Sequence, residues 1–146
     1  MKINIILISD LKDENIKILV AEYKKRINRF AEINFLEIKN KKQPGFIKEI
    51  REKYKSSYFF ILSEKGKNIS SLELSEKIEK ITNYNNSEIS FLIGDADGFE
   101  EEDLTFADEL LSLSKMVFPH ELATLLTFEQ VYRALSILNN HPYHRE

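Results

Sequence analysis

A length of 146 residues, 42% of them hydrophobic and 31% charged, suits one domain with its own core, residues 1–146, and excludes a disordered chain. The chain has no cysteine, which excludes disulfides and cysteine-based metal sites. Its apolar runs are all short of the roughly 18 residues that a transmembrane helix needs, so we expect a cytoplasmic protein with no membrane span.

The first predicted element is the apolar run over residues 2–9. The opening as far as Ile8 looks a little like a signal peptide, but the polar residues Ser9 and Asp10 come next, without a small-residue cleavage pattern. We therefore interpret the run as a strand that is covered on both faces.

Strand and helix patterns then alternate along the chain. In chain order the spacing predicts a helix over 13–30 capped by Asp13, a strand over 33–38, a basic loop over 39–45 and a short helix over 46–54. It next predicts a strand over 58–62, a helix capped by Ser70 or Ser71, a strand over 89–93, a short helix over 100–108, an extended segment over 110–118 and a helix over 120–138.

This alternation predicts an α/β fold, a mostly parallel sheet with helices on both faces. In such folds ligands bind beyond the carboxyl ends of the strands, so the loops to inspect are 63–67, 94–98 and 112–120. The first lacks the P-loop pattern, and the second lacks both the dinucleotide fingerprint and the full EF-hand pattern. The third could line an adenine pocket with its backbone groups, although on local evidence a core strand ending at Pro119 is the simpler interpretation.

The charge is unevenly distributed along the chain. Residues 1–67 hold 16 Lys and Arg against 9 Asp and Glu, a net +7, whereas residues 68–146 hold 5 against 15, a net −10. Such an asymmetry can mark a basic face for phosphates. On charge alone, however, a solvated lysine-rich surface is the more economical explanation.

The C-terminal tail, residues 141–146, is unusually rich in functional side chains for a chain end: His141, Tyr143, His144 and Arg145. Two histidines do not make a zinc site, which needs three or four ligands, and the chain has only one other histidine, at 120. We therefore expect no metal and favour an RNA-contacting role for the tail.

The segments S-K-M-V-F-P-H-E-L, F-E-Q-V-Y-R-A-L-S-I and N-H-P-Y-H-R-E within 112–146 closely resemble the C-terminus of the ribosomal RNA large subunit methyltransferase H family, of the SPOUT superfamily. The resemblance extends over essentially the whole chain. It implies a SPOUT-type fold with a C-terminal trefoil knot, a homodimer, and S-adenosylmethionine bound in the knot. The cofactor-binding positions that it implies are Leu62, Gly94, Leu113, Ser114, Lys115, Met116, Val117 and Phe118.

The reaction implied by the resemblance is methylation of N3 of a pseudouridine in 23S rRNA of the assembled ribosome. Our hypothesis is that the tail of one subunit reaches the cofactor site of its partner. There His144 or Arg145 would stabilise the imide anion, a histidine (His144 or His141) being a candidate base, and Tyr143 would stack on a base or hydrogen-bond to it. The candidate RNA-binding residues outside the tail are Arg133, Lys39, Lys41 and Lys42.

Two departures from the family pattern leave alternatives open. Gly94-Asp95 stands where relatives usually have Gly-Gly, and Thr124 stands where they usually have arginine. A non-catalytic ribosome-binding factor of the same fold is therefore the second hypothesis. The third is a nucleotide-binding α/β enzyme that does not act on RNA.

Overall fold

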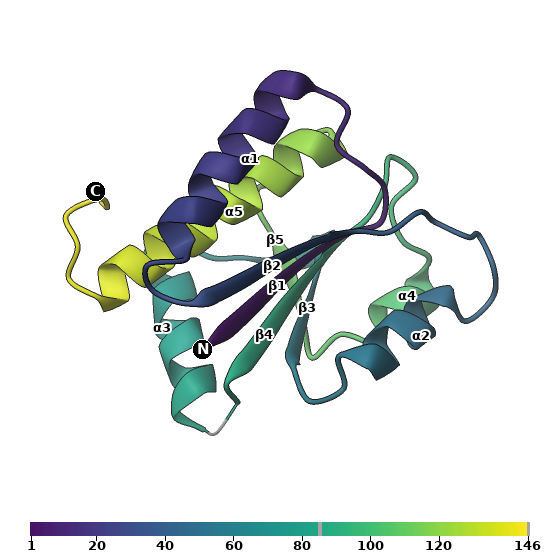
Figure 1. Cartoon of the computed structure of the whole chain (residues 1–146). Helices are drawn as coiled ribbons and strands as arrows, with labels where there is room; N and C mark the ends of the chain where they lie inside the picture. The colour runs from purple at the N-terminus through teal and green to yellow at the C-terminus, as the bar shows by residue number, and fades with distance from the viewer. Residues whose placement is uncertain (85, 146) are drawn as a thin grey trace.

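The computed structural model describes residues 1–84 and 86–145, and its centre is a five-stranded sheet in the order β2-β1-β4-β3-β5 (Figure 1). All four strand pairings are parallel. The predicted α/β class is therefore confirmed. The strands are β1 (Lys2–Leu7), β2 (Glu32–Glu37), β3 (Tyr58–Asn68), β4 (Glu88–Ile93) and β5 (Glu109–Ser112).

Helices cover both faces of the sheet, as predicted (Figure 1). One face packs against α1 (Glu14–Ile27), α3 (Ser71–Asn83) and α5 (His120–Leu138), and the other against α2 (Phe46–Lys53) and α4 (Glu101–Leu104). Successive residues of β1 point to opposite faces, so Ile5 joins the first cluster and Ile6 the second. Because β1 is buried on both faces, its sequence is continuously apolar from Ile5 to Ile8.

Two helix starts follow the predicted capping chemistry. The Asp13 carboxylate accepts hydrogen bonds from the backbone N–H groups of Asn15 at 2.9 Å and Ile16 at 3.2 Å. Ser70, rather than Ser71, caps α3 and forms a reciprocal capping box with Glu73. Both caps satisfy backbone donors that have no partner inside the helix.

The third and fifth strands differ from the prediction. β3 continues to Asn68, so the predicted loop 63–67 is part of a strand, and β5 ends at Ser112, so residues 113–118 are not extended sheet. Leu111 is the register partner of both Leu62 and Lys67, which leaves 63–66 as a bulge beside β5. The polar bulge sequence imitates a turn, and this is why the strand was predicted to end too early.

Gly66 is needed inside this bulge because the backbone of β5 passes very close to it. A Cβ atom at Gly66 would lie 2.7 Å from the backbone of Leu110 and Leu111. The glycine of the first candidate loop therefore serves strand packing rather than ligand contact. The predicted helix over 100–108 is also shorter than expected, since α4 spans only Glu101–Leu104.

A row of polar side chains, three of them buried and Asn34 half-buried, crosses the sheet near the amino ends of its strands. Asn34 Nδ2 donates to Asn4 Oδ1 at 3.1 Å, and Asn4 Nδ2 donates to Ser90 Oγ at 3.1 Å. The hydroxyls of Ser90 and Ser57 lie 2.7 Å apart. These partners are register neighbours on β2, β1 and β4, with Ser57 just before β3, so the row joins four adjacent segments.

The C-terminal trefoil knot stays a prediction from the resemblance. Within the described part of the chain, none of the helices is both long and apolar enough to span a membrane.

Candidate active site

A cavity of about 590 Å³ lies beyond the carboxyl ends of β4 and β5 and beside the middle of β3, at the edge of the sheet where ligands are expected. Its volume is within the usual range for small-molecule sites. Three segments form its walls: the end of β3 with the start of the bulge, the loop after β4, and the loop between β5 and α5. The lining residues are 62–65, 93–99, Leu104, 111–114, 116–120 and Ala123.

The structure brings the predicted cofactor-binding positions together around this cavity. Leu62 comes from β3, Gly94 directly follows β4, and the loop 113–118 supplies the other wall. All of these positions line the cavity except Lys115. Met116 and Val117 are 75% and 87% exposed, so this loop presents apolar side chains to the outside as well.

Local bonds hold two of the three walls in shape. Met116 N–H donates to Ser114 Oγ at 3.0 Å, which fixes the loop after β5. The Asp95 carboxylate accepts from Asn40 Nδ2 at 3.1 Å and from the Asp97 N–H at 3.0 Å. The unusual residue after Gly94 is therefore bonded within the protein, to the β2–α2 loop and to its own turn.

The basic β2–α2 loop lies beside a second cavity of about 700 Å³ that shares Gly94 and residues 97–99 with the first. Lys42 lines this second cavity, whereas Lys39 and Lys41 are exposed but do not line it. The opposite wall contains acidic side chains: Asp97, Glu100, Glu102 and Asp103. Of the three candidate RNA-binding lysines, Lys42 therefore lines a cavity whose walls carry both acidic and basic side chains.

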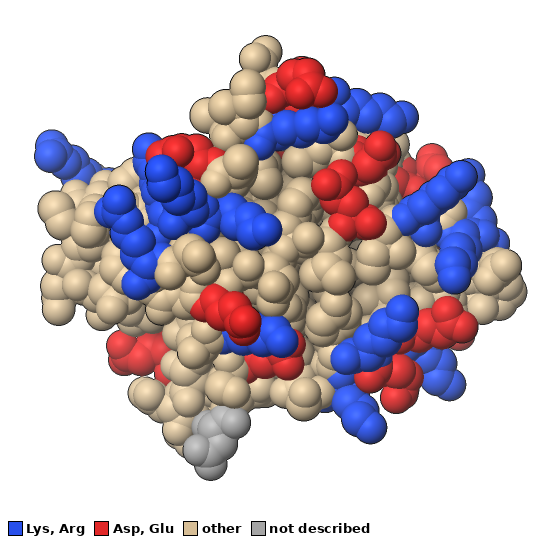
Figure 2. All heavy atoms as spheres, in the orientation of Figure 1, with Lys and Arg blue, Asp and Glu red and all other residues tan. Residues whose placement is uncertain are grey.

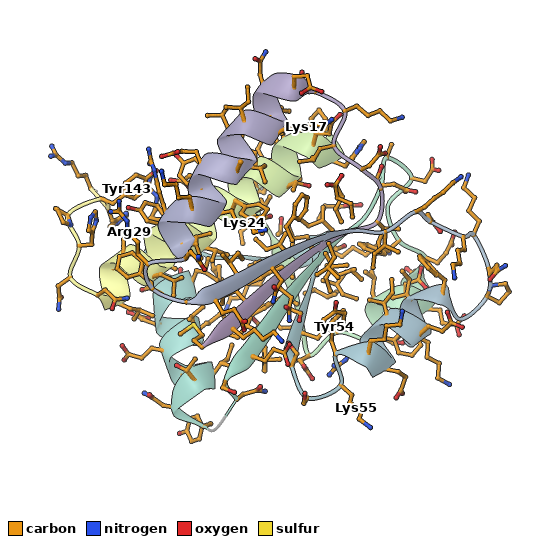
Figure 3. All side chains as sticks on the ribbon, viewed as in Figure 1. Lys17, Lys24, Arg29, Tyr54, Lys55 and Tyr143 are labelled. Atoms are coloured by element: carbon orange, nitrogen blue, oxygen red, sulfur yellow. The ribbon has the colours of Figure 1, made fainter. Side chains whose placement is uncertain are left out.

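The C-terminal tail, by contrast, packs against α1 and α5 (Figure 3), and none of its described residues, 141–145, lines either cavity. The Tyr143 hydroxyl donates to Glu129 Oε1 at 3.0 Å and lies 3.1 Å from the Tyr23 hydroxyl. Because the carboxylate can only accept, Tyr143 donates to Glu129 and Tyr23 donates to Tyr143. The Tyr143 ring also packs edge-on against Tyr132, with 4.6 Å between ring centroids.

Glu129 is the centre of this tail network. Its Oε1 accepts from Arg133 Nε at 3.0 Å and Nη2 at 2.6 Å, besides the Tyr143 hydroxyl. The two side chains of the ion pair are only 23% exposed (Arg133) and 15% exposed (Glu129), so water screens the pair weakly. The hydrogen bond that Arg133 donates to Glu129 raises the pKa of Arg133. Burial raises the pKa of Tyr143 far above its ordinary value, and the hydrogen bonds with Tyr23 and Glu129 add to this effect.

Arg133 links the network to His144. Its Nη1 lies 3.0 Å from His144 Nδ1, and a guanidinium has no acceptor atom, so Nδ1 accepts and the ring proton sits on Nε2. Arg133 is thus engaged inside its own chain, and a phosphate contact by this residue stays a prediction. His141 donates its N–H to Ser136 O at 2.9 Å, which continues the chain from α5 into the tail. Arg145 is exposed, and Glu146 lies outside the described residues.

Sequence reasoning missed Tyr23, Glu129 and Tyr132 as tail-holding residues. Their only signal was that Tyr23 and the F-E-Q-V-Y-R segment belong to the stretches that resemble the family. Thr124, which replaces the usual arginine, is fully buried, and its hydroxyl donates to His120 O at 2.8 Å.

The cavity and the tail lie at opposite ends of α5. His120, the first residue of α5, lines the cavity, and the tail follows the last turn of the helix. The tail folds back along α5 as far as Glu129, which is nine residues, or about 14 Å of helix, from His120. Of the described tail residues, 141–145, none lines the cavity. Among residues 1–84 and 86–145, no group of three or more His, Asp or Glu side chains is placed to hold a metal ion.

Comparison with known proteins gives matches over nearly the whole chain. A family model described as predicted SPOUT methyltransferase matches residues 1–144. The chain is 37% identical to the ribosomal RNA large subunit methyltransferase H of Alkaliphilus oremlandii, covering 99% of this chain and 100% of that protein. It is 38% identical to the protein of the same name from Clostridium botulinum, with the same coverage.

Solved structures show a similar fold at low sequence identity. A probable methylase family protein from Haemophilus influenzae superposes with a TM-score of 0.61 and 14% identity, covering 99% of this chain and 70% of that one. A SpoU methyltransferase from Streptomyces viridochromogenes gives a TM-score of 0.55 and 10% identity, covering 95% and 61%. At these identities the likeness concerns the fold alone.

Proposed function

This chain belongs to the SPOUT methyltransferases and, within them, to the ribosomal RNA large subunit methyltransferase H family, and we propose that its methyl acceptor is N3 of a pseudouridine in 23S rRNA of the assembled ribosome. The protein is an rRNA methyltransferase. A ribosomal substrate would place it in the cytoplasm. The family names do not support the alternative of a non-catalytic binding factor.

The observation that supports the proposal best is the convergence of Leu62, Gly94 and the loop 113–118 on one cavity. We propose that this cavity holds S-adenosylmethionine. Its volume suits a ligand of that size, and its walls combine apolar side chains with loop backbone. At Gly94 a Cβ atom would lie 3.0 Å from the ring of Phe99, another lining residue, so a larger side chain there would press on the cavity wall.

When bound, S-adenosylmethionine supplies a methyl group already activated on a sulfonium, so the chain mainly has to align the acceptor and manage its proton. The N3 of pseudouridine is an imide nitrogen that is largely protonated at neutral pH. Arg145 is exposed at the end of the tail and would stabilise the imide anion by its charge. His144 stays a candidate for stabilising the anion or taking the proton, and in this arrangement its Nδ1 is engaged by Arg133.

The separation of tail and cavity supports a homodimer in which each site combines the cavity of one subunit with the tail of the other. In the structure of a single subunit the two parts are separate, since residues 141–145 do not line the cavity. A symmetric dimer that places α5 of one chain against the cavity of its partner would form two equal composite sites.

The experiment that tests the proposed function is transfer of labelled methyl from S-adenosylmethionine to ribosomes from a strain lacking the enzyme. We expect label on one pseudouridine of 23S rRNA, located by nuclease digestion and mass spectrometry. Ribosomes from the parent strain, already methylated, are the control and should accept little label. Label on another nucleotide would overturn the proposed substrate, and binding of ribosomes without transfer would support the non-catalytic factor.

A further inference from the structure

The end of α1 next to the tail has an unusual concentration of positive charge. Lys24, Lys25 and Arg29 are exposed, and within residues 1–84 and 86–145 none of them has a carboxylate within ion-pairing distance. The acidic side chain in this part of α1, Glu22, is bound to Arg26 at 3.0 Å. Figure 2 shows the resulting group of blue side chains on the left, over the end of α1 and the tail.

Helix stability does not account for all of this charge. Cations in the last turn of a helix interact favourably with its dipole, and this explains lysines at 24 and 25. Arg29, however, lies beyond the last helical residue, Ile27, and adds a further charge to the same end. Like charges so close together repel one another unless an anion lies between them.

The basic end of α1 is joined directly to the tail. Tyr23 of α1 hydrogen-bonds to Tyr143, and the ring of Phe30, one residue after Arg29, lies 6.0 Å from that of His141. Figure 3 labels Lys24, Arg29 and Tyr143 around this same end of the helix. Arg145, at the exposed end of the tail, adds a further positive charge and is itself proposed to contact the substrate.

We infer that Lys24, Lys25 and Arg29, here called the α1 basic surface, bind the phosphate backbone of rRNA beside the target nucleotide while the tail contacts the base. This inference rests on the proposed function and names the surface that its substrate uses. A polyanion suits the surface because it neutralises the three charges and releases its own counterions. The sequence-predicted docking lysines at 39, 41 and 42 suit it less, since the cavity beside their loop has an acidic wall.

The test is ribosome binding and methyl transfer by the triple variant Lys24→Gln, Lys25→Gln, Arg29→Gln at several salt concentrations. A matched control is Lys53→Gln, Lys55→Gln, Lys80→Gln, which removes the same charge from exposed positions outside the tail region. The plot of log affinity against log salt has a negative slope, and loss of three phosphate contacts should make it less steep by about 2. The KM for ribosomes should rise at least about tenfold. Binding of S-adenosylmethionine should be unchanged, because the surface is remote from the cavity.

The outcomes separate the inference from the proposed function. Equal salt slopes for the triple variant and the control would overturn the inference. Weaker ribosome binding without a change of slope would also overturn it and would point to a ribosomal protein as the contact. Failure of the wild-type chain to methylate ribosomes at all would instead reject the proposed function.

Discussion

The cavity and the tail region, which lie along different parts of α5, consist of different types of residue. At the cavity end, glycine, apolar side chains and loop backbone enclose a space, and the conspicuous charges are acidic. Where the tail folds back onto the middle and last turns of α5, aromatic rings and cations surround one carboxylate, Glu129, and exposed cations lie nearby. The first end is suited to enclosing a small ligand and the second to gripping a polyanion. The difference supports the proposal that one chain carries both halves of an active site without assembling them.

The strongest test of this division is removal of the tail by truncation after Asn140. We expect the truncated chain to fold and to bind S-adenosylmethionine, since the tail does not line the cavity. Methyl transfer to ribosomes should fall by at least about 10²-fold, because the groups that handle the acceptor are lost. Circular dichroism and calorimetry would report folding and cofactor binding. Normal activity would refute the assignment of the tail to catalysis.

Mixing two inactive chains sharpens the same comparison. Gly94→Val should prevent cofactor binding, because a branched side chain collides with the Phe99 ring at the cavity wall. Dimers formed at random from this variant and the truncated chain should recover about a quarter of wild-type activity, since half of the dimers contain one complete composite site. No recovery, with mixed dimers verified by mass, would mean that each site is formed within one chain.

A smaller effect is expected from Glu129→Gln, which weakens the tail network without removing the tail. Arg133 loses its ion partner and Tyr143 loses a carboxylate acceptor, so unfolding should become easier by about 1–3 kcal/mol. We expect kcat to fall about tenfold while cofactor affinity is unchanged. Glu76→Gln, at an exposed position on α3, is the matched control. A fall in cofactor affinity as large as the fall in kcat would show that the tail region and the cavity are not independent.

The smallest effect concerns Tyr143 and alkaline pH. Because its pKa is raised in the folded protein, the folded chain keeps the phenol proton where the unfolded chain, with a tyrosine pKa of about 10, loses it. The free energy of unfolding should therefore decline as pH rises above about 10, by at most about 1.4 kcal/mol per pH unit from this group. Tyr143→Phe should show a shallower decline in denaturant titrations than Tyr84→Phe, a control at an exposed position. Identical slopes would contradict the buried, bonded state of Tyr143.

The cavity end was largely predictable from the sequence, whereas the tail end was not. Apolar runs mark strands, and parallel strands end at one edge of a sheet, so the loops 63–67, 94–98 and 112–120 could be expected to meet. The individual positions Leu62, Gly94 and 113–118 came from the resemblance to the family. The prediction failed at the bulge 63–66, because Ser63, Glu64 and Lys65 are polar like a turn. Strand pairing there depends on β5, which follows more than 40 residues later.

The tail residues were recognisable from composition, but their partners were not. Tyr23, Glu129 and Tyr143 are separated by up to 120 residues in sequence, and no periodicity links positions at such distances. Arg133 could be predicted either to lie at an edge or to point at an anion, and the structure shows that the anion is Glu129 of its own helix. Only the packing of α1 against α5 brings these groups together.

The polar row from Asn34 to Ser57 bears on ligand selectivity, because it fixes the register of strands whose other ends border the cavity. A slip of one residue between neighbouring strands would place an amide against an apolar side chain and leave it without a partner, at a cost of about 1–3 kcal/mol for each lost contact. The row therefore fixes the register of the neighbouring strands and so the relative positions of their ends. Ser90 lies only four residues before Gly94, so the register that the row fixes also sets where β4 ends at the cavity. Side chains that do not line the cavity therefore help to determine its depth.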